Sequence, residues 1–276
     1  MCGASTEPMA RRRTTYAMCG RAAVLLLAIA SAAIAQAPSH RNDQPPSVIP
    51  ADIDPCRYFD APGEPMVNFT LEMDEEDRLV PMRVPRRYLD RSPIGEGEMT
   101  LNALFSTFEV HSFEPLPRGE PARRNREGLA WDWMSFIIGD DPSLERNFGV
   151  PLRRNDLPFG DPRMAEEWEN PPHPRDLPSR PAAYGLTEVL VPPNRGIDIP
   201  GSRDFFVHYN SNGELEGWFR CSVAGVGGTQ NENCSHYFRA AGVDVKASYH
   251  RTELPNWRTI QTNVTRFLAC ATSQPL

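Results

Sequence analysis

The clearest pattern of apolar and polar positions lies between residues 204 and 250, where side chains alternate with a period of two. Phe205, Val207 and Tyr209 alternate with a second set of side chains, which is typical of a half-buried strand. Asn212-Gly213 follows, and this dipeptide favours the type I′ turn of a hairpin. The returning strand is predicted to place these residues on one face: Leu215, Gly217, Phe219, Cys221 and Val223.

A second strand pair, at residues 234–239 and 243–250, follows the loop at 225–233. The period then changes to three or four residues, which predicts a helix with Thr252 as its cap. The apolar positions of that helix are Leu254, Trp257, Ile260, Val264 and Leu268. We therefore predict an α+β fold: mainly an antiparallel sheet, with a C-terminal helix packed on one face and long proline-rich connections.

The rest of the chain divides by composition. In the N-terminal part, alternating residues predict strands at 67–73, 79–84 and 101–110, with a helical turn at 85–90. Two or three strands are only marginally stable by themselves. We therefore expect them to pack on the C-terminal sheet. Between residues 114 and 203 lie 15 of the 28 prolines, which predicts extended connections, interrupted by strands at 129–138 and 185–191 and a short helix at 164–169.

The expected organisation has five segments. These are a signal peptide at 1–35, a proline-rich lead-in at 36–55, an N-terminal strand-rich part at 56–113, a proline-rich irregular segment at 114–203, and a C-terminal four-stranded antiparallel sheet plus helix at 204–276.

The signal peptide is predicted from an arginine-rich start and an apolar run at 22–35 that ends in small residues. The run is shorter than the roughly 20 residues of a membrane span, which favours cleavage over a retained anchor. Met18 is an alternative start. Export predicts a periplasmic or secreted bacterial protein that meets the membrane only through this segment, before cleavage.

Four cysteines remain after cleavage: Cys56, Cys221, Cys234 and Cys270. In an oxidising compartment they predict two disulfides, with three possible connectivities. We favour Cys221 with Cys234, at the facing ends of the two hairpins, and Cys56 with Cys270. In the loop-entropy description the two closures contribute about 3 and roughly 5 kcal/mol. The alternative is a zinc site of Cys221, Cys234 and His236 with His208 or His250, although the spacing lacks paired ligand motifs.

Charge narrows the choice of partners. The chain carries a formal net charge of −7, and loss of residues 1–35 removes four arginines and Glu7, which makes it more acidic. An acidic surface repels phosphate backbones, so we expect no nucleic-acid partner. Lys246 is the one lysine beside 28 arginines, a bias that a GC-rich genome explains.

No familiar catalytic motif occurs in the sequence. It lacks a G-x-S-x-G elbow, an S-x-x-K or H-E-x-x-H motif and a P-loop lysine. Neighbouring carboxylates, such as Asp140 and Asp141, are interpreted as solvated surface charge. We therefore expect no catalytic residues, no bound metal and no cofactor.

The C-terminal sheet carries one candidate polar patch. If their side chains face away from the core, His208, Arg220, His236 and His250 could form a site for a general base or a ligand. Surface histidines are the commoner explanation. Trp131 and Trp133 could stack on a sugar, but tryptophans in a strand are more often core residues.

About a third of the chain resembles exported proteobacterial proteins that carry no assigned activity. The residues that carry the resemblance are Gly185-Leu186, Cys221, Cys234-x-His236-x-Phe238 and Tyr249-x-Arg251-x-x-Leu254-Pro255-x-Trp257-x-x-Ile260. The resemblance implies a periplasmic location and brings no activity with it.

Three functions remain open. The leading hypothesis is an exported periplasmic protein that binds another macromolecule, with a protein partner in the envelope, either as an immunity-type protein or as an envelope accessory protein. The second is a hydrolase that uses His208, His236 and His250 with nearby carboxylates. The third is a structural component of the envelope.

Overall fold

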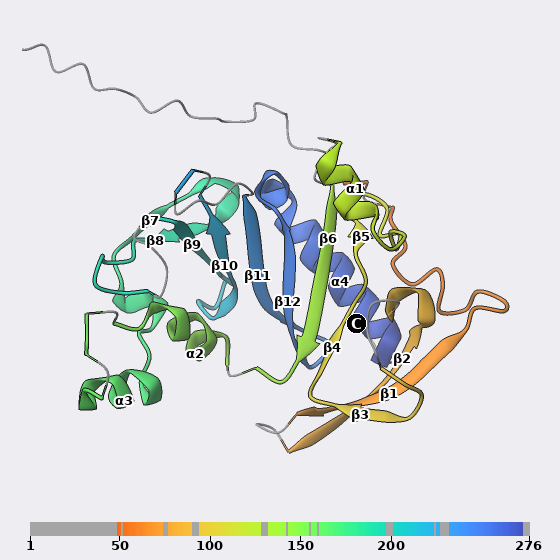
Figure 1. Cartoon of the computed structure of the whole chain (residues 1–276), viewed down its shortest axis with the longest axis horizontal. Coiled ribbons are helices and arrows are strands. Elements are labelled where there is room, and N and C mark those ends of the chain that lie inside the picture. Colours follow the sequence, from red (N-terminus) through yellow and green to blue (C-terminus); the bar gives the residue numbers. More distant parts are fainter. Residues whose placement is uncertain are drawn as a thin grey trace, which may run out of the picture. The chain divides into compact units, whose positions relative to one another are not determined.

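The computed structural model describes most of the chain from residue 49 onward (Figure 1). The described ranges are 49–50, 52–73, 77–89, 94–127, 132–141, 143–154, 156–158, 160–196, 201–223, 225–226 and 232–272. The predicted signal peptide, most of the lead-in and Trp131 lie outside these ranges. Within them, no helix has both the length and the apolar character needed to cross a membrane.

The predicted four-stranded sheet forms the centre of a larger, nine-stranded sheet. Its central strands are β9 (Arg203–Tyr209), β10 (Leu215–Ser222), β11 (Asn233–Ala240) and β12 (Val243–His250). All pairings in this sheet are antiparallel. The α+β architecture predicted from the sequence is therefore confirmed.

Additional strands extend the sheet on both sides. β6 (Trp133–Gly139) pairs with β12, and β4 (Asn102–Leu104) and β5 (Phe108–Glu109) pair with β6. On the other side, β8 (Thr187–Val189) pairs with β9 and β7 (Ser179–Pro181) forms the edge. The strand predicted at 101–110 is thus two short strands.

The helix α4 (Trp257–Thr272) packs on one face of this sheet (Figure 1). It begins later than predicted, because Arg251–Asn256 forms a 3₁₀ helix that contains Pro255. Phe267 is fully buried among aromatic rings, 4.8 Å from Tyr88 and 5.4 Å from Phe105 between centroids. Such edge-to-face contacts add to the stabilisation from burial alone.

A second sheet from the N-terminal part shares this core. Its order is β2 (Arg78–Pro85), β1 (Met66–Met73) and β3 (Glu98–Thr100), with β1 and β3 parallel. Leu71 and Val84 belong to the same cluster of buried residues as Phe267. The N-terminal strands therefore pack with the C-terminal half, as expected from their small number.

The proline-rich segment forms short helices as well as connections. They are α1 (Glu120–Arg126), α2 (Leu144–Gly149) and α3 (Pro162–Glu169). Pro162 occupies the first turn of α3, where its missing N–H costs nothing, and the Asp161 side chain caps the helix. α2 lies against β10 and β11 on the face opposite α4, which we call the outer face.

The predicted type I′ turn at Asn212-Gly213 is wrong. Gly213 has a φ of +81°, but Asn212 does not have a positive φ. Instead, the Asn210 side chain accepts hydrogen bonds from the Asn212 and Glu214 N–H groups and stabilises a wider turn. The turn with two positive φ angles connects β11 to β12, at Ala241 and Gly242.

A β-bulge also changes the predicted faces of β10. Leu215 pairs with Tyr209 and Gly217 with His208, so the register shifts at the residue between them. Leu215 consequently joins the cluster on the outer face, whereas Phe219 faces α4. The sequence had placed Leu215 and Phe219 on one face.

Two disulfides fasten the fold. Cys221 and Cys234 are cross-strand partners on β10 and β11, with their Cα atoms 4.0 Å apart. Cys56 is bonded to Cys270 of α4, across 214 positions of the sequence. These pairs are the ones that the sequence favoured.

Candidate functional site

One row of cross-strand neighbours on the outer face runs through most of the large sheet. The row contains Leu104, Ile137, Lys246, Tyr237, Trp218 and Val207, in the order in which their strands pair. Because paired residues point to the same side of a sheet, these side chains share one surface. The row has a covered half and an open half.

The covered half lies under α2. Trp218 is 1% exposed, and its ring stacks on Tyr237 with the centroids 3.9 Å apart. Phe148 of α2 meets the Trp218 ring edge to face at 5.5 Å. The helix therefore completes a second hydrophobic core, separate from the one under α4.

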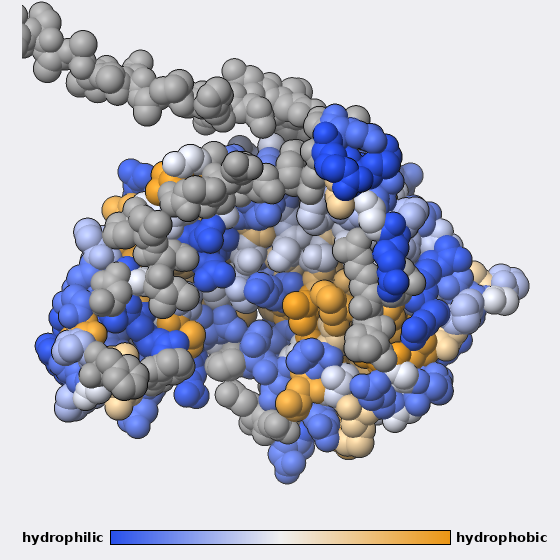
Figure 2. Space-filling view, viewed as in Figure 1, coloured by the Kyte–Doolittle hydropathy of each residue, from blue (hydrophilic) through white to orange (hydrophobic). Residues whose placement is uncertain are grey.

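The open half consists of Leu104, Ile137 and Lys246. Leu104 and Ile137 are 39% and 38% exposed, although both lie on paired strands of the sheet. Met99 of β3 and Leu101, between β3 and β4, are exposed as well. Figure 2 shows the resulting apolar surface over β4 and β6. Clustered exposed aliphatic side chains of this kind are typical of an interaction surface.

Two carboxylates border the open half. Asp244 points to the same side of β12 as Lys246, and its side chain accepts a hydrogen bond from the Asp141 N–H at 3.3 Å. Burial, more than any nearby charge, raises the pKa of Asp244 to about 6. Partial desolvation also raises the pKa of Asp141, which Lys246 lowers and Asp140 raises, and the Asp141 charge in turn adds to the rise at Asp244. The chain's own cations act on both carboxylates, because Arg239 lowers the pKa of Asp244 and Lys246 lowers that of Asp141.

His236 lies inside the protein, on the α4 face. Its side chain is fully buried, stacked 4.0 Å from the Phe219 ring and 3.2 Å from the Tyr249 hydroxyl through Nδ1. Burial lowers its pKa to about 3. A neutral imidazole closed off from solvent in this way has no access to a substrate.

Of the other predicted patch residues, His208 shares the α4 face and the Trp257 ring with His236, whereas Arg220 and His250 lie on the opposite face. His208 is on the α4 face, with its ring 4.8 Å from Trp257. Arg220 and His250 belong to the outer face, and His250 bonds to Thr252 at 2.9 Å. The four residues do not form one surface patch.

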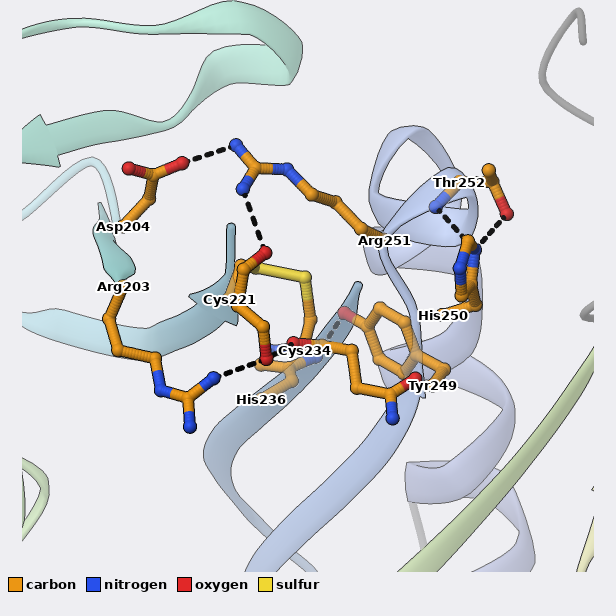
Figure 3. The surroundings of a disulfide bond; sticks show 11 residues. Arg203, Asp204, Cys221, Cys234, His236, Tyr249, His250, Arg251 and Thr252 are labelled. Carbon is orange, nitrogen blue, oxygen red and sulfur yellow. Dashed lines mark hydrogen bonds and ion pairs between the residues drawn. A yellow bond between two sulfur atoms is a disulfide. The ribbon is translucent and has the colours of Figure 1, made fainter. Parts of the chain in front are cut away.

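The surroundings of the Cys221–Cys234 disulfide are paired polar groups (Figure 3). Arg251 donates to the Ser222 carbonyl oxygen at 3.2 Å and forms an ion pair with Asp204. Because the two cysteines are bonded to each other, they cannot act as zinc thiolates. Among the described residues, no group of three or more His, Cys, Asp or Glu side chains could hold a metal ion.

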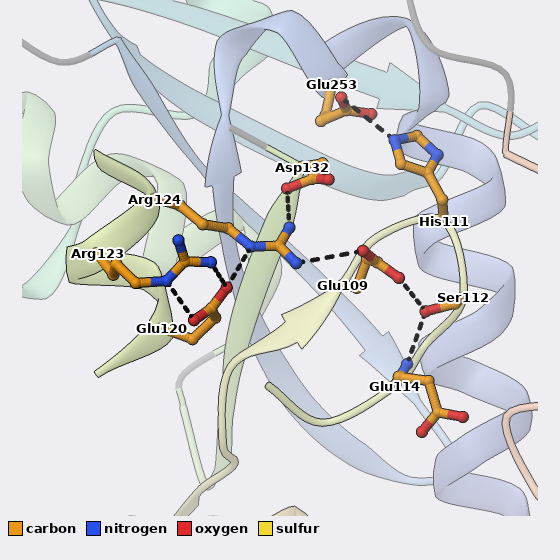
Figure 4. Close-up of polar contacts among 9 residues, drawn as sticks. All are labelled: Glu109, His111, Ser112, Glu114, Glu120, Arg123, Arg124, Asp132 and Glu253. Atoms are coloured by element: carbon orange, nitrogen blue, oxygen red, sulfur yellow. Dashed lines mark hydrogen bonds and ion pairs between the residues drawn. The ribbon is translucent and has the colours of Figure 1, made fainter. Parts of the chain in front are cut away.

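A second polar network connects α1 to the strands beneath it (Figure 4). Arg124 is surrounded by Asp132 at 2.6 Å, Glu120 at 3.1 Å and Glu109 at 3.5 Å. Hydrogen bonds from Arg123 and Arg124 lower the pKa of Glu120 to about 2. Asp132, Glu120 and Glu109 are each paired with Arg124, so this network cross-links segments of the chain.

A pocket of about 240 Å³ lies between Pro151, in the turn after α2, and the paired strands β8 and β9. Its charged lining residues already have partners within the chain. Glu188 pairs with Arg180 at 2.8 Å, and Arg195 pairs with Glu167 at 2.9 Å. The pocket therefore presents paired charges and proline rings, with no convergent catalytic group.

Sequence reasoning did not identify the open half. Its members come from β4, β6 and β12, and each looks like an ordinary strand residue. Asp141, interpreted from the sequence as surface charge, is exposed, although partial desolvation raises its pKa. The exposed aliphatic positions become visible only when the order of the strands and the position of α2 are known.

No protein-family model matches the chain, and no curated protein matches it. Two solved structures are similar to it in part. One is Smlt3025, an immunity protein of the Stenotrophomonas maltophilia type IV secretion system: TM-score 0.48, 16% identity, covering 74% of this chain and 92% of the other. The second is FrpD, an iron-regulated outer-membrane lipoprotein of Neisseria meningitidis: TM-score 0.38, 12% identity, covering 75% of this chain and 92% of the other.

Proposed function

We propose that this protein is an exported bacterial protein that acts by binding a basic protein partner through the open half of its outer face. An immunity-type protein and an envelope accessory protein are both forms of this function. The observation that carries the proposal is the exposure of Leu104 and Ile137, at 39% and 38%, in a row whose other half is covered by α2.

The apolar side chains argue for a protein partner. Ile137 and Leu104 are direct cross-strand neighbours, so they form one continuous surface and not two isolated exposed positions. A partner that covers them removes apolar area from water, which stabilises the complex in proportion to that area. The serines at 135 and 248, on the same side of the sheet, can form hydrogen bonds around this centre.

The charges argue that the partner is basic. Asp141 and Asp244 border the open half, and partial desolvation raises the pKa of each carboxyl group. A lysine or arginine brought by a partner would stabilise both carboxylates and lower their pKa values. The chain as a whole is acidic, with a net charge of −7, which also accelerates encounters with a basic protein.

The proposal also accounts for the sequence features that suggest export. The predicted signal peptide would deliver the chain to an oxidising compartment, and both disulfides are of the kind that persists there. We therefore place the protein in the periplasm or outside the cell. The hydrolase alternative requires His208, His236 and His250 in one accessible site, and no observation on these residues favours it.

The experiment compares two matched variants of the full chain. Ile137→Asp disrupts the open half, whereas Leu190→Asp changes a leucine that is equally exposed, at 39%, near the other edge of the sheet. Each tagged variant is produced in the bacterial host and recovered from the envelope without reductant. We expect the wild type and Leu190→Asp to retain one stoichiometric basic protein, and Ile137→Asp to retain at least ~10-fold less.

Equal recovery of that partner by both variants would show that the open half is not the binding surface. Thermal unfolding of each purified variant serves as the control for folding. An enzymatic activity that survives removal of every bound protein would contradict the proposal in a different way.

A further inference from the structure

The tip of the β7–β8 hairpin holds an exposed tyrosine in a strained backbone conformation. Tyr184 has φ 61° and ψ 23°, in the left-handed region that bulky residues rarely adopt. Its side chain is 51% exposed. Strain of this kind persists only where surrounding contacts enforce it, and such residues cluster at functional sites.

Two side chains from other elements enforce the conformation. Nε1 of Trp257, the first residue of α4, donates to the Tyr184 carbonyl oxygen at 3.1 Å. Nδ1 of His208 lies 3.2 Å from the Gly185 carbonyl oxygen, while Nε2 of the same ring lies 3.2 Å from the Glu216 carboxylate. Consecutive carbonyls of the tip are thus fastened to the helix and to the sheet.

Comparison with Phe113 shows what is unusual about Tyr184. Phe113 also has a positive φ, of 56°, but its ring is fully buried and stacks 5.0 Å from Phe108. Burial of that ring offsets the strain of its backbone. The Tyr184 ring gains no comparable burial from the described residues, so only the contacts of Trp257 and His208 to the tip carbonyls hold this exposed side chain in place.

An arginine accompanies the tyrosine. Arg258 is exposed, with its guanidinium 4.9 Å from the Trp257 ring centroid. The guanidinium of Arg258 lies directly against the tip. A Cβ atom added at Gly185 would be only 2.9 Å from it. Tyrosine and arginine are two of the three residue types that most often dominate binding energy in interfaces.

We propose that the tip of the β7–β8 hairpin is a second protein-contact surface. Tyr184 inserts into an apolar pocket of a protein partner, and Arg258 pairs with a carboxylate at the rim of that pocket. The contacts to Trp257 and His208 hold the tyrosine in its bound orientation, which reduces the entropy lost on binding. This surface lies beside α4, whereas the open half lies on the outer face, so the inference stands independently of the proposed function.

Site-specific photo-cross-linking in the bacterial host tests the proposal. A photoreactive residue replaces Ala183, which is exposed beside Tyr184, in the full chain. The matched control is Ser211, exposed at the tip of the neighbouring β9–β10 hairpin. We expect one adduct of defined mass from position 183 and none of that mass from position 211.

Three second-site variants then separate binding from folding. Tyr184→Asn keeps a residue that tolerates the left-handed region but removes the ring, and should reduce the adduct at least about 30-fold without loss of thermal stability. Arg258→Ala should also reduce it, and Tyr184→Phe should retain most of it. An adduct that survives Tyr184→Asn, or no adduct at position 183, overturns the inference.

A photoreactive residue at Ile137 distinguishes the two surfaces. An adduct at 137 without one at 183 overturns this inference and leaves the proposed function standing. An adduct at 183 that depends on Tyr184, without one at 137, supports the inference and contradicts the proposed function. Adducts of different mass at the two positions support two partners, one at each surface.

Discussion

The two halves of the outer face differ in what covers them, although they belong to one sheet. In the covered half, α2 lies over Trp218 and Tyr237, and the aromatic side chains are buried. In the open half, Ile137 and Leu104 occupy equivalent positions in the same row but remain more than a third exposed. The difference shows that α2 gives the covered side chains a role in the fold, whereas the open ones remain accessible to solvent.

The largest expected effect comes from removing one side chain in each half. Trp218→Ala should lower the free energy of unfolding by about 3–5 kcal/mol, because it leaves a cavity between the sheet and α2. Ile137→Ala should change it by less than about 1 kcal/mol, because that side chain is already partly solvated. Urea unfolding of the two variants measures the contrast, and equal losses would show that the open half also belongs to a core.

The next effect is the pH dependence of the unfolding free energy that the buried His236 causes. Burial lowers the pKa of His236 from 6.5 to about 3, so only the unfolded chain takes up a proton in that interval. Stability should therefore fall as the pH is lowered from 6.5 towards 3, by up to about 1.4 kcal/mol per pH unit from this group.

The variant that tests this effect is His236→Phe, which keeps a planar ring against Phe219. It should be less stable than the wild type at pH 7 because the Tyr249 hydroxyl loses a partner. Its unfolding free energy should nevertheless depend less on pH between 4 and 6.5. An unchanged pH dependence, measured by urea unfolding at each pH, would mean that another group is responsible.

Asp244 should change the stability with pH in the opposite direction from His236. Its pKa is raised from 3.8 to about 6 in the folded protein, so the folded state binds the proton more tightly and gains stability as the pH falls through 6. Asp244→Asn should therefore stabilise the protein at pH 8 by on the order of 1 kcal/mol, after allowance for solvent screening. The gain should vanish near pH 4. Thermal unfolding at the two pH values measures it, and a constant gain would contradict this assignment.

The smallest effect concerns the boundary between the halves. The Lys246 ammonium lies 5.7 Å from the Tyr237 ring centroid, within reach of a cation–π interaction at a partly exposed site. Lys246→Met, which keeps most of the aliphatic stem, should cost only about 0.5 kcal/mol. If the free energy of unfolding, measured with urea, fell by several kcal/mol instead, Lys246 would belong to the covered half.

The strands of the C-terminal sheet could be predicted because their signals are local. Period-two alternation and the cysteines at 221 and 234 were sufficient for β9 to β12 and for one disulfide pair. The bulge after Leu215 was not predictable in this way. A single inserted residue reverses the faces of part of a strand, and alternation alone does not reveal where it occurs.

The candidate surfaces needed information that no local pattern contains. Leu104, Ile137 and Lys246 become neighbours only through the order β4-β6-β12. Tyr184 adopts its strained conformation because Trp257 and His208 bond to the tip from elements distant in the sequence. Sequence patterns identified these residues as strand or turn residues, and only tertiary structure shows their exposure.

The most direct test of the binding surface is the affinity of the purified partner, measured by titration calorimetry with the wild type, Ile137→Asp and Leu190→Asp. We predict at least a ~10-fold weaker affinity for Ile137→Asp alone. We also predict that wild-type affinity falls at high salt, because salt would screen the proposed pairing of Asp141 and Asp244 with basic side chains of the partner. Equal affinities of all three proteins, independent of salt, would contradict the account.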